Sequence, residues 1–206
     1  SGVLALPRLA GAQDFPNRAI RMIIPYPPGG ASDVIARILG PHMTEALGQP
    51  IVIENRPGGN GGIAAEFVAR SPADGYTLLM GNAGPNALNA AVYGARLTYD
   101  VIRDFTPISL VSKVPMLIAS HPSVPITNLQ EMIALGRARN GDLSFAHGGT
   151  GAAPHLTMEQ LADMNGFKWT PVPFRGGALA LTSVLSNQVP IIADTAVVVL
   201  PHVREG

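Results

Sequence analysis

Four polar or glycine-rich loops each follow a predicted strand and lead into a predicted helix. They read PPGGASD (27–33), GNAGPN (81–86), HGGTGAAPH (147–155) and FRGGA (174–178). The start of a helix presents free N–H groups and a partial positive charge, and glycine lets the backbone approach a ligand closely. Each loop alone could be an ordinary strand-to-helix turn. Together they predict a site for a small anion such as a carboxylate, held mostly by main-chain N–H groups.

Two histidines, His147 and His155, flank the third loop and could meet in space as a metal-binding pair or as catalytic groups. His155 falls in the first turn of a predicted helix, where a structural role is the simpler interpretation. A hydrolase-type triad has no local signature, because the sequence contains no G-x-S-x-G motif. No glycine loop ends in Lys-Ser or Lys-Thr, which excludes a Walker A loop. We therefore predict neither a catalytic residue nor a metal site.

Two further features have competing interpretations. Asp33 either caps its helix or accepts hydrogen bonds from a ligand, and its charge disfavours a highly charged anion in the first loop. The stretch GNGGIA (59–64) fits the dinucleotide pattern G-x-G-x-x-A. However, ENRP separates it from the preceding strand, and no acidic residue stands about 20 positions further along the chain. A dinucleotide site is therefore not predicted.

The elements that position these loops alternate between strand and helix. The predicted strands span 20–26, 51–55, 76–81, 106–112, 115–121, 143–147, 169–174 and 190–194, and the predicted helices span 32–47, 62–70, 86–93, 128–139, 153–166 and 178–188. Gly40 and Pro41 lie inside the first helix and are expected to kink or interrupt it. The alternation predicts an α/β protein with mainly parallel sheets, in which ligands bind beyond the carboxyl ends of the strands.

The composition excludes several classes of partner. The 206-residue chain carries 14 basic and 14 acidic residues, so it has no electrostatic footprint for nucleic acid or a membrane surface. The absence of Cys excludes disulfides, thiolate metal sites and a Cys nucleophile. Residues 2–13, GVLALPRLAGAQ, end in an A-x-A-like site and predict a signal-peptide remnant over residues 1–14, hence export; a floppy apolar tail is the alternative. No other stretch approaches the ~18 apolar residues of a membrane-spanning helix.

Several stretches, in the right order and at the right spacing, resemble the substrate-binding proteins of tripartite tricarboxylate transporters, also called the Bug family. They are RMIIPYPPGGASDVIAR (21–37), GQPIVIENRPGGNGGIAAEFVARSPADGYTLLMG (48–81), ASHPS (119–123) and VPFRGGALALTSVLSNQV (172–189). The resemblance implies a periplasmic binding protein of type II (Venus-flytrap) with two α/β lobes, here residues 15–113 and 114–206. It implies a monomer that closes on a small organic acid and delivers it to a membrane permease or a sensor, without cofactor or enzymatic activity.

The resemblance also implies ligand contacts in both lobes. The contacts carried over are Gly30, Ala31, Ser32, Asp33, Asn82 and Ala83 in the first lobe, and His147, Gly149, Thr150, Gly151, Ala152, His155, Arg175, Gly176 and Asp194 in the second. His147 and Ala152 stand where the family commonly has hydroxyl residues. The hydroxyl missing at Ala152 removes one hydrogen bond worth roughly 0.5–1.5 kcal/mol, which the neighbouring Thr150 could compensate. A cationic His147 would favour an acid ligand or a lower pH.

Family members continue past the last residue of this chain and return to complete the first lobe. We therefore expect a fragment or a truncated paralogue without that return, with unpaired strand edges and exposed apolar surface. Three functions stay open: a solute-binding protein for a carboxylate, a hydrolase-like α/β enzyme that acts on a small acid through His147 or His155, and a degenerate fragment that binds other proteins. The sequence does not identify the acid.

Overall fold

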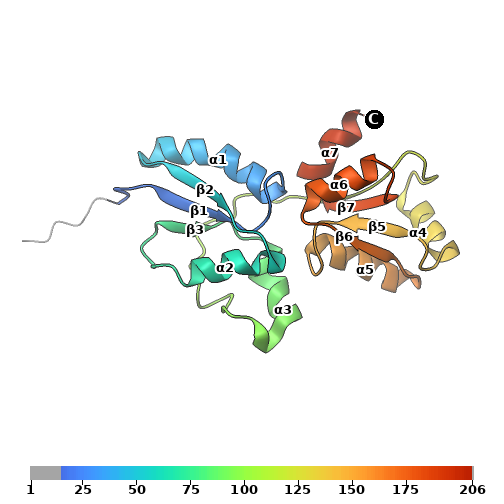
Figure 1. Ribbon diagram of the computed structural model, residues 1–206, viewed down its shortest axis with the longest axis horizontal. Coiled ribbons are helices and arrows are strands. Elements are labelled where there is room, and N and C mark those ends of the chain that lie inside the picture. Colours follow the sequence, from blue (N-terminus) through green and yellow to red (C-terminus); the bar gives the residue numbers. More distant parts are fainter. Residues whose placement is uncertain (1–14, 206) are drawn as a thin grey trace, which may run out of the picture.

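The computed structural model describes residues 15–205, which form two α/β units, each built on its own sheet (Figure 1). We call residues 15–105 lobe 1, residues 116–205 lobe 2 and residues 106–115 the connecting segment. The predicted signal-peptide remnant over residues 1–14 lies outside the described residues. Within residues 15–205, no helix is long and apolar enough to cross a membrane.

Lobe 1 is a parallel three-stranded sheet of order β2-β1-β3, with helices on both faces (Figure 1). Its elements are β1 (Ile20–Ile24), α1 (Ala31–Leu47), β2 (Ile51–Asn55), a 3₁₀ turn (Gly59–Gly61), α2 (Gly62–Ala69), β3 (Thr77–Leu79), a π-helical turn (Gly84–Leu88), α3 (Asn89–Tyr93) and a second 3₁₀ turn (Gly94–Arg96). The core forms where Met22 and Ile24 of β1 pack with Ala36 of α1 and with Met80. The central strand β1 therefore fixes where the loop to α1 begins.

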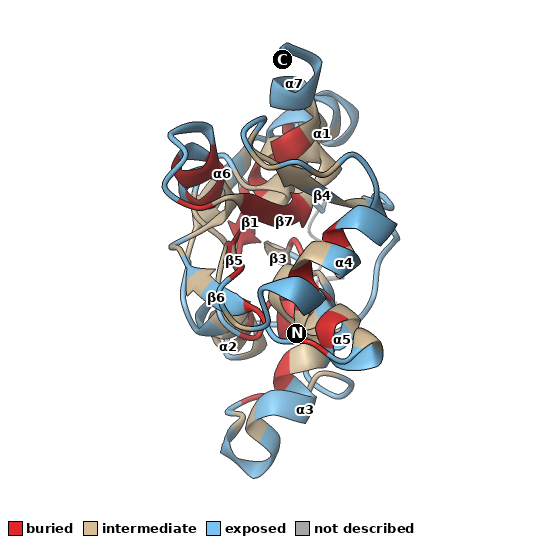
Figure 2. Cartoon of the chain, turned by 90° about the vertical axis from the view of Figure 1, so that its right-hand side faces the viewer, coloured by how far each residue is buried: buried red, intermediate tan, exposed pale blue. Residues whose placement is uncertain are grey.

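Lobe 2 is a four-stranded sheet of order β4-β7-β5-β6, parallel except for the pair β4–β7. Its elements are β4 (Met116–Ser120), α4 (Leu129–Ala138), β5 (Ser144–His147), α5 (Ala153–Asn165), β6 (Thr170–Pro173), α6 (Gly177–Leu185), β7 (Ile191–Thr195) and α7 (Ala196–Glu205). Phe145 and Ile191 belong to the core cluster on one face, and Ala146 and Ile192 belong to the cluster on the other. Because side chains alternate along a strand, β5 and β7 are apolar on both faces and largely buried (Figure 2).

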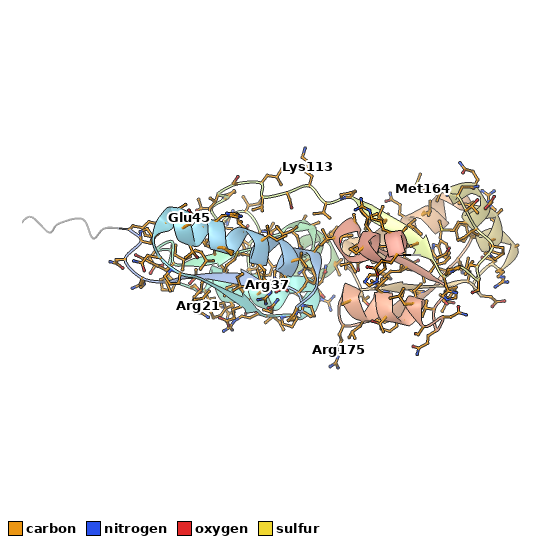
Figure 3. The ribbon with its side chains drawn as sticks, turned by 90° about the horizontal axis from the view of Figure 1, so that it is seen from above. Arg21, Arg37, Glu45, Lys113, Met164 and Arg175 are labelled. Atoms are coloured by element: carbon orange, nitrogen blue, oxygen red, sulfur yellow. The ribbon has the colours of Figure 1, made fainter. Side chains whose placement is uncertain are left out.

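The connecting segment corrects the sequence prediction. Residues 106–112 were predicted to form a strand, but they pair with no described strand, and Ile108 and Leu110 are 80% and 72% exposed. The segment crosses between the lobes with Lys113 projecting from it (Figure 3). Apolar and β-branched residues show that a chain is able to pair; they do not show that a partner strand is present. The neighbouring predicted strand does form, as β4.

Helix α1 corrects a second prediction, because it runs without interruption through Gly40 and Pro41. Gly40 is buried against β2, where a Cβ atom would lie 3.3 Å from Ile53 Cδ1. Pro41 is exposed, so the carbonyl that loses its N–H partner faces water. Thr44 Oγ1 also donates to the Gly40 carbonyl at 2.9 Å. The remaining predicted helices and strands are present, with their ends shifted by a few residues, and α7 follows them.

Candidate functional site

The carboxyl ends of the parallel strands in both lobes face one another, and their loops meet at a contact that we call the lobe–lobe junction (Figure 1). Asn60 of lobe 1 donates from Nδ2 to the carbonyl of Gly151 in lobe 2 at 2.9 Å. A Cβ atom added at Gly176 would lie 3.2 Å from Pro27 Cγ, and one at Gly29 would lie 3.8 Å from Ala178 Cβ. The structure thus brings the first, third and fourth predicted loops together.

On the lobe 1 side, the junction is a network of amide and hydroxyl side chains. Tyr26 lies within hydrogen-bond distance of Asn60 Oδ1 (3.0 Å) and Asn82 Oδ1 (3.3 Å). Asn82 Oδ1 accepts from the Gly84 N–H, and Asn82 Nδ2 donates to Ser32 Oγ at 3.3 Å. Burial raises the pKa of Tyr26 to about 12, so its hydroxyl keeps its proton at neutral pH. Two predicted contacts, Ser32 and Asn82, therefore lie beside Tyr26, which was not predicted.

Asp33 is committed to hydrogen bonds inside lobe 1. Its carboxylate is 3% exposed and accepts from the Gly29 N–H (3.0 Å), from Asn55 Nδ2 (2.9 Å) and from Arg37 Nε (3.0 Å). Burial alone would raise the pKa of Asp33, but the hydrogen bonds from Arg37, Gly29 and Asn55 outweigh it and lower the pKa. The arrangement favours the helix-start interpretation of Asp33, because it ties the first turn of α1 to β2 and to the preceding loop.

On the lobe 2 side, two histidines satisfy the N–H groups of the ligand loop that we predicted. The Gly149 N–H donates to His147 Nδ1, and the Gly151 N–H donates to His155 Nδ1, both at 3.2 Å. The Ala152 N–H donates to the Gly149 carbonyl at 3.2 Å. A backbone N–H can only donate, so each Nδ1 is an acceptor and each neutral ring carries its proton on Nε2. The backbone of this loop is therefore shaped by His147 and His155.

His147 is neutral in this environment, so the positive charge that an imidazole is able to carry is not available to favour an acid ligand at neutral pH. The side chain is 1% exposed, and its ring centroid lies 5.4 Å from that of Phe145 and 4.5 Å from that of His155, tilted against both rings. Burial lowers the pKa of His147 to about 4, with repulsion from His155 adding to the effect and the Gly149 hydrogen bond opposing it. Within residues 15–205, no group of three His, Cys, Asp or Glu side chains is placed to hold a metal ion.

Asp194 lies at the carboxyl end of β7 and is 7% exposed. Among the described residues, only Thr195 donates to it, from N (2.7 Å) and Oγ1 (3.2 Å), both to Oδ1. Burial raises the pKa of Asp194, and the Thr195 hydrogen bonds only partly oppose this. Gly177 is in contact with the carboxylate, because a Cβ atom at that position would collide with Oδ2. Asp194 therefore occupies the space in front of the α6 N-terminus.

The remaining predicted residues fall into three groups. Gly30 is the N-cap of α1 and Ala31 begins the helix, while Ala152 is the N-cap of α5; none of these helix starts has a side-chain cap. Thr150 and Ala83 are exposed. Gly176 contacts Pro27, but the neighbouring Arg175 is exposed and projects away from the protein (Figure 3). Tyr26, Asn60 and Gly177 were not among the predicted contacts, although Gly177 lies in the predicted loop FRGGA and Asn60 lies in the glycine-flanked stretch GGNGG.

Two surface hollows lie on lobe 1, away from these loops. One of about 500 Å³ is lined by Arg21, Glu66, Phe67 and neighbouring residues, and one of about 550 Å³ is lined by residues between Ala90 and Asp104. Glu54 bridges Arg21 and Arg56 beside the first hollow, and both guanidinium groups lie over the Phe67 ring. Arg70 of this hollow is paired with Glu66, so the charged side chains that line the first hollow are paired and leave no free cation there to hold an anion.

The family model described as the tripartite tricarboxylate transporter family receptor matches residues 35–206. The chain belongs to this family. It is 35% identical over 196 residues to the protein BugT of Bordetella pertussis, a match that covers 95% of this chain and 60% of BugT. The chain therefore spans about 60% of the length of that family member.

Two solved structures of family type superpose well on this chain. Rpa4515 of R. palustris, determined with adipate, superposes with a TM-score of 0.89 at 35% identity. The superposition covers 94% of this chain and 64% of the Rpa4515 chain. MatC of Rhodopseudomonas palustris, determined with bound malate, superposes with a TM-score of 0.84 at 33% identity. That superposition covers 93% of this chain and 65% of the MatC chain. The predicted fold, a two-lobed periplasmic binding protein with mainly parallel sheets, is confirmed.

Proposed function

We propose that this receptor-family chain is the ligand-capturing part of a periplasmic solute-binding protein. Its ligand is a small organic acid, held between lobe 1 and lobe 2 and delivered to the membrane permease of a tripartite tricarboxylate-type transporter. The observation that carries the proposal is the meeting of loops at the lobe–lobe junction, with the N-terminus of α5 uncapped by any side chain. The relatives determined with adipate and malate support the ligand class.

The carboxylate is assigned to the start of α5. Among the described residues, the N–H groups of Thr150, Ala153 and His155 donate to no protein acceptor, whereas those of Gly149, Gly151 and Ala152 already do. The free groups surround the positive end of a 13-residue helix. The starts of α1 and α6 also lack a side-chain cap, but each has a buried carboxylate beside it that would repel an anion: Asp33 at the loop before α1 and Asp194 in front of α6. The loop that ends at α5 is therefore where lobe 2 holds an anion.

The first lobe is assigned to the rest of the ligand. Ser32, Tyr26 and Asn82 present hydroxyl and amide groups at the junction, without a free cation among them. Polar, uncharged groups recognise the shape and hydrogen-bonding groups of a ligand better than its net charge. A small mono- or dicarboxylate fits this arrangement better than a tricarboxylate, because neither Arg37, which is bound to Asp33, nor the outward-pointing Arg175 is available at the junction.

The hydrolase alternative gains no support from the geometry of residues 15–205. Both histidines use Nδ1 to accept a backbone N–H, and His155 Nε2 lies 4.0 Å from Glu159. Neither ring has a free lone pair with which to act as a general base in its neutral form. We therefore propose binding without turnover, no cofactor, and a monomer as the working state.

A thermal-shift panel tests this proposal. Small mono- and dicarboxylates, including adipate and malate, are added to the chain, and the neutral diamide of adipic acid serves as the matched control without charge. A ligand that binds only the folded state adds about 2.7 kcal/mol to the unfolding free energy at a hundredfold excess over its Kd. We expect at least one acid to raise the Tm and its amide to leave it unchanged. An equal response to acid and amide, or turnover of an acid, would overturn the proposal.

A further inference from the structure

Residues 58–61 form a turn in which four successive residues have positive φ. The values are 130° for Gly58, 55° for Gly59, 50° for Asn60 and 82° for Gly61. Residues with a Cβ atom rarely adopt this conformation, and asparagine is among those that tolerate it best. Gly61 is also tightly packed, since a Cβ atom there would lie 2.9 Å from Pro25. The stretch that fits a dinucleotide pattern therefore begins in a left-handed turn, residues 58–61, in which Asn60 is the one residue with a side chain.

The Asn60 carboxamide uses all of its strong hydrogen-bonding groups. Its Oδ1 accepts from the Tyr26 hydroxyl at 3.0 Å, and its Nδ2 donates to Asn89 Oδ1 at 3.1 Å and to the Gly151 carbonyl at 2.9 Å. Asn89 is 1% exposed and is itself held by Tyr99, whose hydroxyl lies 3.2 Å from Asn89 Nδ2. The side chain is thus oriented by two lobe 1 residues, and its remaining N–H is aimed across the junction into lobe 2.

Gly151 is held from both lobes. Its N–H donates to His155 Nδ1 within lobe 2, and its carbonyl accepts from Asn60 of lobe 1. Its φ of 78° leaves it unable to accept a side chain without strain. Gly151 lies between Thr150 and Ala153, whose N–H groups are free. The Gly151 carbonyl belongs to the peptide that links Gly151 to Ala152, so holding it restricts the chain between the free N–H groups of Thr150 and Ala153.

We propose that Asn60 is a positioning residue that couples contact between the lobes to the shape of the ligand loop. When the lobes are together, Asn60 holds the Gly151 carbonyl and orients the loop for an anion; when they separate, the hydrogen bond is lost and the loop relaxes. The part of this inference that concerns a ligand rests on the proposed function. The part that concerns the loop does not, because it concerns a hydrogen bond between two residues of this chain.

The test replaces Asn60 with glycine, which removes the side chain and keeps the positive φ free of strain. Asn187→Gly is the matched control, since Asn187 also has a positive φ (57°) and lies in lobe 2, where Ser123 donates to it. Amide hydrogen exchange of residues 148–156 is measured by mass spectrometry on the full chain without ligand. We expect roughly 2- to 10-fold faster exchange in Asn60→Gly and no change in Asn187→Gly, from the loss of one hydrogen bond.

Tyr26→Phe is the second variant, because it removes the hydroxyl that holds Asn60 and leaves the turn intact. We expect a smaller acceleration of exchange in the same residues. The part of the inference that concerns a ligand is tested by titrating each protein with adipate and malate. We expect the affinity to be weakened by a similar factor in Asn60→Gly and to be unchanged in Asn187→Gly. Unchanged exchange in Asn60→Gly, or equal changes in both Asn→Gly variants, would overturn the inference. If neither acid binds the unmodified chain, the proposed function fails at that point while the exchange result still decides the role of Asn60.

Discussion

The two lobes each bury one aspartate beside a helix start, but they treat its charge in opposite ways. Asp33 of lobe 1 is surrounded by donors from Gly29, Asn55 and Arg37, and its pKa is lowered. Asp194 of lobe 2 receives hydrogen bonds only from Thr195 among the described residues, and burial raises its pKa. In lobe 1, polar side chains are therefore used to hydrogen-bond the buried carboxylate of Asp33. In lobe 2, the buried carboxylate of Asp194 receives few hydrogen bonds from its surroundings.

The same contrast holds for the loops around the two aspartates. On lobe 1, Tyr26, Asn60 and Asn82 form a connected network of side chains. On lobe 2, the loop after β5 has the sequence GGTGA (148–152), and His147 and His155 accept hydrogen bonds from its N–H groups. Lobe 1 is therefore a pre-ordered network of side chains, while lobe 2 offers the main-chain N–H groups that we propose hold an anion.

The largest effect is expected from the pH dependence of lobe 2. Burial holds the pKa of His147 near 4, below the usual 6.5, so the unfolded chain binds a proton first as the pH falls. The stabilisation from neutral His147 is thus complete above about pH 6.5 and is lost towards pH 4, on the order of 3 kcal/mol in total. His147→Asn keeps an acceptor for the Gly149 N–H without a titrating ring. Denaturant melts of both proteins should differ in their pH slope between 6.5 and 4, and parallel slopes would contradict the burial of a neutral ring.

A smaller effect separates the loop glycines of the two lobes. A Cβ atom at Gly148 would lie 2.8 Å from Gly177 N, against backbone that cannot move aside, whereas one at Gly30 would lie 3.4 Å from the Pro27 carbonyl. We expect Gly148→Ala to lower the unfolding free energy by about 2 kcal/mol and Gly30→Ala to change it by less than about 0.5 kcal/mol. Urea melts of the two variants measure the difference. Equal effects would show that the lobe 2 loop is not packed as tightly as the junction requires.

The smallest change in stability is expected when the two buried aspartates are replaced by asparagine, and its sign should differ between Asp33 and Asp194. Asp33→Asn should lower the unfolding free energy at pH 7 by about 1–2 kcal/mol, because it weakens charge-assisted hydrogen bonds that are only partly shielded from water. Asp194→Asn should raise the unfolding free energy by up to about 1 kcal/mol, because the amide has nearly the shape of the carboxylate but carries no charge to be buried.

The pH dependences of these two groups differ in the same way. With its pKa lowered, Asp33 contributes stability that is present above its usual pKa and lost as the pH falls. With its pKa raised, Asp194 favours the folded state at low pH and loses that contribution as the pH rises. Melts of the two Asp→Asn variants at several pH values test both signs, and two changes of the same sign would remove the contrast between the lobes.

Much of the fold follows from local sequence patterns. The alternation of apolar runs with amphipathic stretches predicts the parallel sheets, and the position of the glycine-rich loops after strands predicts which ends of the sheets face a ligand. The strand predicted at 106–112 failed because strand formation requires a partner that sequence patterns do not reveal. The interruption predicted at Pro41 failed because that ring lies on the exposed side of α1.

The junction itself was harder to predict, because it depends on contacts between residues far apart in the chain. Asn60 and Gly151 are separated by 91 positions, and nothing in either local stretch indicates the other. The sequence showed that His147 could carry a charge, but not that its ring packs against Phe145 and His155 and stays neutral. Gly177 contacts Asp194 of β7 and lies close to Gly148 of the loop after β5, and both are distant from it in the sequence. Sequence patterns therefore predicted the loops, but not which of their polar groups form hydrogen bonds within the protein.

The most direct test follows the backbone amides of the ligand loop by NMR during a titration with adipate or malate. A carboxylate at the start of α5 should move the amide protons of Thr150, Ala153 and His155 downfield. The amides of Gly149 and Gly151, which already donate to His147 and His155, should move less. Saturable shifts in that order would establish that main-chain N–H groups of lobe 2 hold the acid. Shifts centred instead on the surface hollow beside Phe67, or none in residues 148–155, would contradict it.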